Sequence, residues 1–240
     1  MPVTTAQLAQ LELDAAAIGT LRTDRVSIPG TPCNYEITRP ADFDLLLDSA
    51  AGDPEQNLPY WAEVWPSGIA LAAALLDDPS PWEGQRALEL GSGLGITATA
   101  ALQCCMSLLV TDYSSESLAL CALNTARNAG RMPLTCRVNW REPDTAFFRM
   151  CGDGFPVVLA ADVLYEARDV EPLVALVERM VAPGGTFWLA EPGRPPAQRF
   201  VAAMAVSGWC DNVGSCAGPW PDPEDTAKGV VVRVHRMTRG

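Results

Sequence analysis

Histidine is almost absent from this sequence. His235, near the C-terminus, is the only one, and none of the eight cysteines belongs to a Cys-x-x-Cys pair. Zinc sites are built mainly from closely spaced cysteine and histidine side chains. We therefore expect no metal site, and no histidine is available as a general base.

Basic residues are also scarce. The chain has 17 Lys and Arg against 29 Asp and Glu, which gives a formal net charge of −12. Sequence-independent binding of nucleic acid depends on clustered positive side chains that neutralise phosphates. The composition argues against nucleic acid as a partner and suits a basic or neutral substrate, although acidity that only maintains solubility would give the same composition.

Membrane-directed segments are not evident. Residues 1–5 have neither the basic start nor the apolar core of a signal peptide. Residues 91–111 carry no charge, but a glycine-rich turn and several polar side chains favour a buried helix and a buried strand. Cysteines inside apolar runs behave as small hydrophobes. We therefore expect reduced thiols, a cytoplasmic location and no membrane partner.

The most informative segment is residues 87–100, Ala-Leu-Glu-Leu-Gly-Ser-Gly-Leu-Gly-Ile-Thr-Ala-Thr-Ala. The apolar run predicts a strand, the glycines predict a tight turn and the alanine-rich part predicts a helix. Gly91, Gly93 and Gly95 lack Cβ atoms, so the backbone can approach a ligand closely, and the helix N-terminus adds a positive dipole. The pattern predicts a nucleotide or nucleoside site; an ordinary strand-to-helix turn is the alternative.

Two cofactor classes compete for this turn. Dinucleotides require Gly-x-Gly-x-x-Gly, but Ile96 stands where the last glycine would be. Glu89 would repel a pyrophosphate and attract the α-amino group of S-adenosylmethionine. The spacing Glu89-x-Gly91-x-Gly93-x-Gly95 resembles the cofactor signature of class I methyltransferases. The resemblance implies S-adenosylmethionine as cofactor and S-adenosylhomocysteine as product.

Further cofactor residues follow at the ends of the next two predicted strands. Asp112 ends a strand predicted over residues 108–112, where a carboxylate can accept hydrogen bonds from ribose hydroxyls or cap the next helix. Asn139 and Trp140 come at the end of a strand predicted over residues 134–139. In the related methyltransferases this position usually reads Asp-Trp. The resemblance implies that Asn139 binds the adenine amino group and that Trp140 stacks on the base, while a core role for Trp140 stays open.

A short motif after the strand predicted at residues 156–161 points to the acceptor. Asp162-x-x-Tyr165 resembles the motif of the protein-lysine methyltransferases often called family sixteen, which include those acting on the electron-transfer flavoprotein β-subunit. The resemblance implies that Asp162 orients the incoming amine, that Tyr165 lines a channel around the alkyl stem, and that Ala161 contacts the cofactor. The alternative for Asp162 is a helix cap.

The aromatic segment over residues 58–68 resembles the segment that precedes the cofactor-binding motif in the same family. On that likeness Trp65 contacts the cofactor, Tyr60 or Trp61 forms part of the acceptor channel, and Ser67 replaces a glycine of the pattern. A hydrophobic plug is the alternative interpretation of these aromatic side chains.

The order of predicted elements favours an α/β fold of three layers. It is a Rossmann-like, seven-stranded and mostly parallel sheet that ends in an antiparallel pair at residues 209–216 and 229–235. We expect residues 1–57 to form an N-terminal extension with a helix and a hairpin packed on the core, and residues 58–240 to form the methyltransferase domain. Other expected features are a helical turn at 42–49, loops at 52–54 and 219–225, helices at 170–181 and 197–207, a turn at 183–185 and a strand at 186–190.

The most specific functional hypothesis is N-methylation of a lysine side chain in a protein substrate. Three alternatives remain: a small-molecule N- or O-methyltransferase, a non-catalytic cofactor-binding protein of the same fold, and an oxidoreductase if the chain binds NAD instead. The sequence contains nothing that specifies an oligomeric state.

Overall fold

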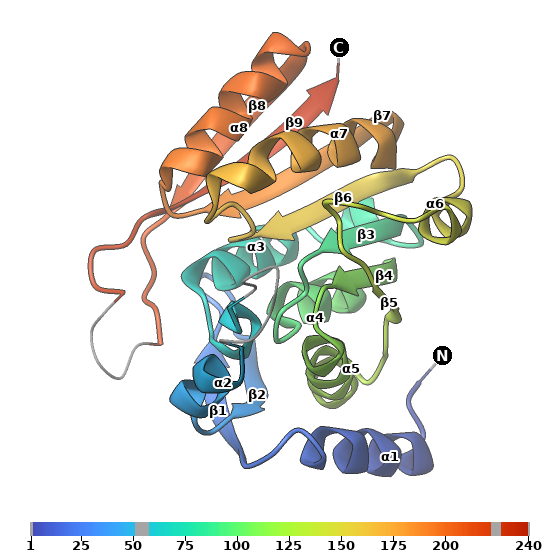
Figure 1. Ribbon diagram of the computed structural model, residues 1–240, viewed down its shortest axis with the longest axis vertical. Helices are drawn as coiled ribbons and strands as arrows, with labels where there is room; N and C mark the ends of the chain where they lie inside the picture. Colours follow the sequence, from blue (N-terminus) through green and yellow to red (C-terminus); the bar gives the residue numbers. More distant parts are fainter. Residues whose placement is uncertain (1, 51–57, 222–226, 240) are drawn as a thin grey trace.

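The computed structural model describes residues 2–50, 58–221 and 227–239. Its centre is a seven-stranded sheet covered by helices on both faces, and a small two-stranded sheet lies to one side (Figure 1). The loop predicted at residues 52–54 lies outside the described residues. The same is true of residues 222–225 of the predicted acidic loop.

The central sheet has the strand order β5-β4-β3-β6-β7-β9-β8. Pairing is parallel from β5 through β7, and β9 runs antiparallel to both β7 and β8. This arrangement confirms the predicted fold class. The strands are β3 (Arg86–Leu90), β4 (Ser107–Asp112), β5 (Leu134–Arg137), β6 (Phe155–Ala161), β7 (Val181–Glu191), β8 (Trp209–Cys216) and β9 (Val232–Arg239).

Two apolar cores lie on the two faces of this sheet. Successive side chains point to opposite faces of a strand, so Ala87 and Leu159 enter one core while Leu88 and Val158 enter the other. The first core is shared with α3 (Pro66–Asp77), α4 (Ile96–Gln103) and α5 (Ser115–Ala129). The second is shared with α6 (Thr145–Cys151), α7 (Val170–Met180) and α8 (Pro195–Val206). Burial on both faces explains why the central strands read as continuous apolar runs.

The N-terminal part forms two helices and a hairpin. These elements are α1 (Thr5–Ala16), β1 (Leu21–Ser27), β2 (Asn34–Pro40) and α2 (Phe43–Ala50). A capping box between Thr4 and Gln7 starts α1. Both α1 and β2 pack against α5, so the hairpin and the first helix lie on the same side of the molecule (Figure 1).

Two asparagines on α5 hold the edge of β2. Asn124 Nδ2 donates to the Thr38 carbonyl at 3.0 Å, and the Thr38 N–H donates back to Asn124 Oδ1 at 2.8 Å. One turn later Asn128 makes the same pair of hydrogen bonds with Glu36, at 2.9 and 2.8 Å. Four helical residues and two strand residues both span roughly 6–7 Å. The two amides therefore take the place of a neighbouring strand and satisfy this edge.

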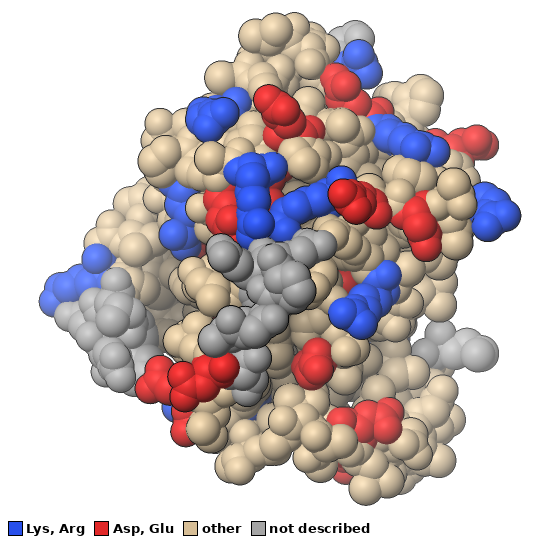
Figure 2. Space-filling model, in the orientation of Figure 1, with Lys and Arg blue, Asp and Glu red and all other residues tan. Residues whose placement is uncertain are grey.

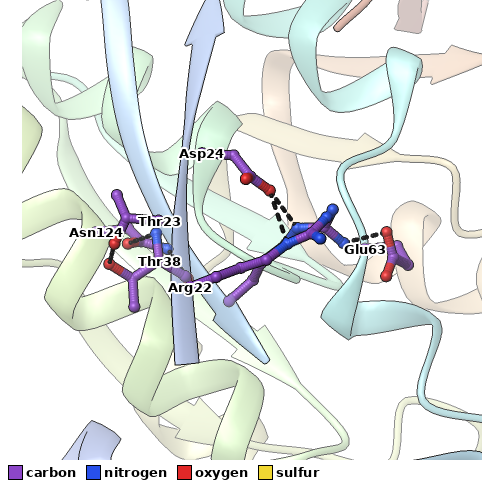
Figure 3. A network of polar contacts seen from close by, with 7 residues as sticks. Arg22, Thr23, Asp24, Thr38, Glu63 and Asn124 are labelled. Carbon is purple, nitrogen blue, oxygen red and sulfur yellow. Dashed lines mark hydrogen bonds and ion pairs between the residues drawn. The ribbon is translucent and has the colours of Figure 1, made fainter. Parts of the chain in front are cut away.

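A buried arginine joins the hairpin to the segment that precedes α3. The Arg39 side chain is 8% exposed, lies 2.6 Å from Asp24 of β1, and also pairs with Glu63. Figure 3 shows the ion pairs that run from Asp24 to Glu63, with Arg22 also contacting Asp24. This network fixes the Tyr60–Ala62 turn, a 3-10 helix, relative to the hairpin.

Three predicted boundaries were wrong. Residues 183–185, predicted as a turn, lie inside β7, where pairing shifts from Phe155–Val181 to Val157–Thr186. Four residues of β7 therefore stand opposite one residue of β6, and a bulge rich in glycine is hard to distinguish from a turn in sequence. β5 ends two residues earlier than predicted. β9 begins three residues later than the predicted start at 229.

Neither the surface charge nor the cysteines indicate a particular partner. Figure 2 shows Lys and Arg side chains intermixed with Asp and Glu on the face in view. All eight cysteines are free thiols. Within the described parts of the chain, no helix has the length and apolar character that crossing a bilayer would require.

Candidate cofactor and acceptor site

A cavity of about 690 Å³ lies at the carboxyl ends of β3, β4 and β6. Its lining includes Gly91 and Gly93 after β3, Asp112 at the end of β4 and Ala161 at the end of β6. After β3 the chain adds β4 and β5 on one side of the sheet, and then returns to add β6 and β7 on the other. Open α/β sheets bind ligands at this switch point. The fold thus brings residues from three separate segments to one site.

The glycine turn has left-handed backbone at each glycine. The φ angle is 72° at Gly91, 48° at Gly93 and 80° at Gly95. A Cβ atom at Gly91 would lie 2.8 Å from Val163 Cγ1, and one at Gly95 would lie 2.8 Å from the Sγ and 3.0 Å from the Cα of Cys121. Gly91 and Gly93 line the cavity. Gly95 lies at the start of α4 and allows that helix to pack closely against α5.

Glu89 is a buried carboxylate with an unused acceptor. It is 2% exposed, and within the described part of the chain its Oε2 has no hydrogen-bond partner. Burial, together with the Asp112 carboxylate, raises the pKa of Glu89 well above its usual value. Glu89 and Gly95 are not among the side chains that line the cavity. An unpaired buried oxygen near the end of β3 suits a cationic or hydrogen-bond-donating ligand.

Asp112 lines the cavity and also supports the glycine turn. Its Oδ2 accepts from the Gly93 N–H at 3.0 Å, and its Oδ1 accepts from the Ser114 N–H at 3.1 Å. The cap of α5 is Ser114, which accepts from the Ser117 N–H, so Asp112 is not the helix cap. Burial raises the pKa of Asp112 overall, although these hydrogen bonds oppose the shift.

Asn139 and Trp140 lie in the loop after β5 and line the cavity. Asn139 Oδ1 accepts from the Arg141 N–H at 3.1 Å. Trp140 is half-buried and packs against the second core. It therefore has both a core contact and a surface in the cavity.

Aromatic side chains form another part of the wall. The Tyr60 ring lies 5.0 Å from the Tyr165 ring and 6.1 Å from the Trp65 ring, edge-on in both cases. Trp65 Nε1 donates to the Tyr60 carbonyl at 2.7 Å. Tyr60, Trp61, Trp65 and Tyr165 all line the cavity. Burial, and then the Asp169 carboxylate, raise the pKa of Tyr165 above its usual value, so its phenol stays protonated at neutral pH.

Asp162 has an unusual backbone and a cationic partner. Its φ of 53° is in the left-handed region, which a non-glycine residue adopts at some cost in strain. Arg194 Nε donates to its Oδ1 at 2.9 Å, and the Asp162 side chain is 7% exposed. Ser67 Oγ lies 3.4 Å from Oδ2. The segment between β7 and α8 therefore contributes a charge to this site.

The comparisons with known proteins assign the family. Residues 56–205 match the family described as lysine methyltransferase. The chain belongs to this family. It is a family of class I methyltransferases with S-adenosylmethionine as cofactor.

The chain has curated relatives of modest identity. It is 29% identical over 140 residues to an electron transfer flavoprotein beta subunit lysine methyltransferase of Danio rerio, covering 57% of this chain and 51% of the relative. The Xenopus laevis protein of the same name is 32% identical over 142 residues, with 57% and 53% covered. The chain thus spans about half the length of these relatives.

Solved structures support the fold. A putative RNA methyltransferase of Pyrococcus horikoshii superposes with a TM-score of 0.57 at 12% identity, covering 82% of this chain and 97% of that one. Magnesium protoporphyrin IX methyltransferase of Synechocystis with bound cofactor also gives a TM-score of 0.57 at 12% identity, with 84% and 98% covered. At this identity the likeness concerns the fold alone.

The residues of the chain fit this cofactor. The unpaired Glu89 oxygen is a buried hydrogen-bond acceptor near the end of β3, and the backbone at Gly91 and Gly93 leaves no side chain between turn and cavity. Asp112 adds a second carboxyl group, which lines the cavity itself.

Several residues that line the cavity were not predicted from the sequence. Asp14 and Ile18 near the end of α1, Leu46 of α2, and Glu116 of α5 all line the cavity. Arg194, which pairs with Asp162, was also missed. The sequence carries a partial signal for it, because Glu191-Pro192-Gly193-Arg194 follows a strand whose carboxyl end lies at the same edge of the sheet.

Proposed function

We propose that the protein transfers a methyl group from S-adenosylmethionine to the side-chain amine of a lysine in a protein substrate. The observation that carries this proposal is the place of Asp162 and Tyr165, which follow β6 at the wall of the cavity that Gly91 and Asp112 also line. S-adenosylmethionine supplies a methyl group already activated by a positive sulfur. The work left to the protein is to align the two reactants and exclude water.

The proposed cofactor-binding residues surround this cavity or support it. In the proposal Glu89 accepts from the α-amino group and Asp112 accepts from the ribose hydroxyls, in addition to holding the glycine turn. The amide of Asn139 binds the adenine amino group, and the ring of Trp140 stacks on the base. The full set is Trp65, Glu89, Gly91, Gly93, Gly95, Asp112, Asn139, Trp140 and Ala161.

Asp162 and Tyr165 receive the acceptor. A lysine side chain has a free pKa of about 10.4, so it arrives as an ammonium and must lose one proton before it can attack. In the proposal the amine donates a hydrogen bond to the Asp162 carboxylate, and the Tyr165 and Tyr60 rings enclose its alkyl stem. The N–C bond forms as the C–S bond breaks, and that electron pair stays on sulfur. His235 is engaged with Asp211 at 2.7 Å in β8 and β9, so solvent takes the proton.

A small-molecule methyltransferase is the second candidate. A ubiquinone biosynthesis O-methyltransferase of Rhizobium etli is 28% identical over 128 residues, covering 53% of this chain and 49% of that protein. Both reactions use the same methyl donor, so this likeness does not by itself identify the acceptor. The Asp162-x-x-Tyr165 pair favours the lysine acceptor.

Radiolabelled cofactor separates the two candidates. The purified protein is incubated with methyl-labelled S-adenosylmethionine and a cell extract, and the label is followed in protein bands and in the low-mass fraction. We expect label on protein in an acid-stable and base-stable linkage, as an N-methyl group requires. Label confined to the low-mass fraction would support the small-molecule reaction, and binding of cofactor without any transfer would support a non-catalytic protein.

A further inference from the structure

A second cavity of about 570 Å³ adjoins the first, and both are lined by Trp65 and Asp162. Its remaining walls include Arg39, Glu63, Arg194 and Trp220. The Asp162 side chain thus borders both cavities. A charged group that pairs with Asp162 from the second cavity can therefore affect what binds in the first.

The Arg194 side chain lines the second cavity, next to the two residues that both cavities share. It pairs with Asp162 and lies 5.9 Å from the centre of the Trp65 ring. Its side chain is 38% exposed, whereas that of Asp162 is 7% exposed. The cation can therefore move into solvent by side-chain rotation, while the carboxylate it leaves stays buried.

The backbone that carries Arg194 is held firmly. Gly193, with a φ of 97°, donates its N–H to Glu191 Oε2 at 2.5 Å and accepts from Gln198 Nε2 at 3.1 Å. Proline at positions 192 and 195 fixes φ on either side. Displacement of the guanidinium thus needs no movement of the chain.

We propose that Arg194 is a specificity-determining residue, which occupies Asp162 until the acceptor's ammonium group replaces it. This inference rests on the proposed transfer to an amine. A buried carboxylate without a counter-ion is strongly unfavourable. An arriving cation restores the lost charge pair, whereas a neutral hydroxyl or an anion does not, so the exchange selects amines.

The displaced guanidinium also has a second effect. It stays tethered to the same site and can remain near the face of Trp65. A like charge close to the bound ammonium favours loss of its proton. Arg194 therefore selects a cation on entry and promotes the neutral amine that attacks.

The test uses small probes and no turnover. n-Butylammonium, the end of a lysine side chain, is titrated by NMR into the protein with S-adenosylhomocysteine, alongside butyrate and butan-1-ol. Arg194→Met removes the charge and keeps the length, and Arg194→Lys is a second variant that keeps a cation. Arg22→Met is the matched control, since Arg22 is 44% exposed and also pairs with an aspartate.

We expect Arg194→Met to bind n-butylammonium at least about fivefold more tightly than the unmodified protein, because the competitor is gone. Arg194→Lys and Arg22→Met should bind it within twofold of the unmodified protein, and Asp162→Asn should abolish the gain in the Arg194→Met background. Equal or weaker binding by Arg194→Met, or no binding by any form, would overturn the inference. Butyrate binding that is lost in Arg194→Met would also overturn it, since Arg194 would then recognise an anion. If the extract labelling failed but the probes bound as expected, the proposal that the acceptor is a protein lysine would be wrong, and the inference about Arg194 would stand.

Discussion

Among individual residues, Asp162 is the one on which the proposed function depends most. Its left-handed backbone turns the chain at the end of β6, its carboxylate holds Arg194, and its side chain borders both cavities. Strained backbone at a cavity wall is common where a side chain must point in one direction. We expect its role to lie in handling the acceptor and not in holding the cofactor.

Replacement of Asp162 tests whether this residue acts on the acceptor and not on the cofactor. We expect Asp162→Ala to leave the affinity for S-adenosylhomocysteine within a few-fold and to lower turnover by about 100-fold or more. Calorimetry measures the first quantity and label transfer the second. Asp153→Ala, at an exposed carboxylate, is the control and should change neither. Weak cofactor binding with normal turnover at saturation would show that the role is misassigned.

The glycine turn gives a prediction about stability. Gly95→Ala places a Cβ against Cys121 and forces alanine to a φ of 80°, so we expect a loss of about 2 to 3 kcal/mol in the free energy of unfolding. Gly130→Ala is the matched control, because Gly130 has a φ of 63° and nothing within 4 Å of the added atom. It should cost only about 1 kcal/mol. Equal losses in urea denaturation would contradict the packing role of Gly95.

Some of the site residues could be predicted from the sequence. Glu89, Asp112 and Asp162 could be placed at one edge because each follows a predicted strand and parallel strands share that edge. Arg194 could not, since its ion pair with Asp162 depends on the path of the side chain between the ends of the neighbouring strands β6 and β7. Sequence spacing carries no record of that path.

At the level of elements, the β1–β2 hairpin depends on α5. The sequence shows Asn124 and Asn128 one turn apart, but not that they would face the backbone of Glu36 and Thr38. That match involves segments more than 80 residues apart. Only the structure, in which β2 lies along α5, shows this match.

The two asparagines should not contribute equally. Asn124 is fully buried and bonds to both backbone groups of Thr38 and to the Leu94 carbonyl. We expect Asn124→Ala to cost about 2 to 3 kcal/mol, because buried partners are left unpaired. Asn128→Ala, where water can replace the amide, should cost about 1 kcal/mol or less. Hydrogen exchange at the Thr38 amide should speed up only in Asn124→Ala; protection that persists there would contradict the bracing role.

The sheet edge formed by β7, β8 and β9 predicts a pH dependence. Burial opposes the charged form of His235, but Glu191 and Asp211 raise its pKa above the usual value. Because the pKa of His235 is higher in the folded than in the unfolded chain, its protonation stabilises the fold fully below about pH 6.5, the unfolded value. This stabilisation is lost as the pH rises through the folded-state pKa. Each unit of elevation is worth about 1.4 kcal/mol. We expect the stability difference between the unmodified protein and His235→Gln to shrink from pH 6 to pH 9, as urea unfolding can measure. A difference that grows with pH would contradict this sign.

For the whole molecule, the fold class was predictable because of the alternation of predicted strands and helices and the antiparallel pair at the end. The division into residues 1–57 and 58–240 stays a prediction. The large cavity takes part of its wall from α1 and α2, and tertiary packing of this kind leaves no local pattern in the sequence. The N-terminal part thus contacts the site in two ways: it forms part of the cavity wall, and Arg39 of β2 pairs with Glu63.

The central claim, transfer of methyl groups to lysine in protein, is tested most directly by tandem mass spectrometry of extract proteins treated with enzyme and cofactor. The account predicts a lysine residue heavier by one or more methylene masses after treatment with the unmodified protein and unchanged after treatment with Asp162→Ala. Methylation found only on small molecules, or on a side chain other than lysine, would contradict it.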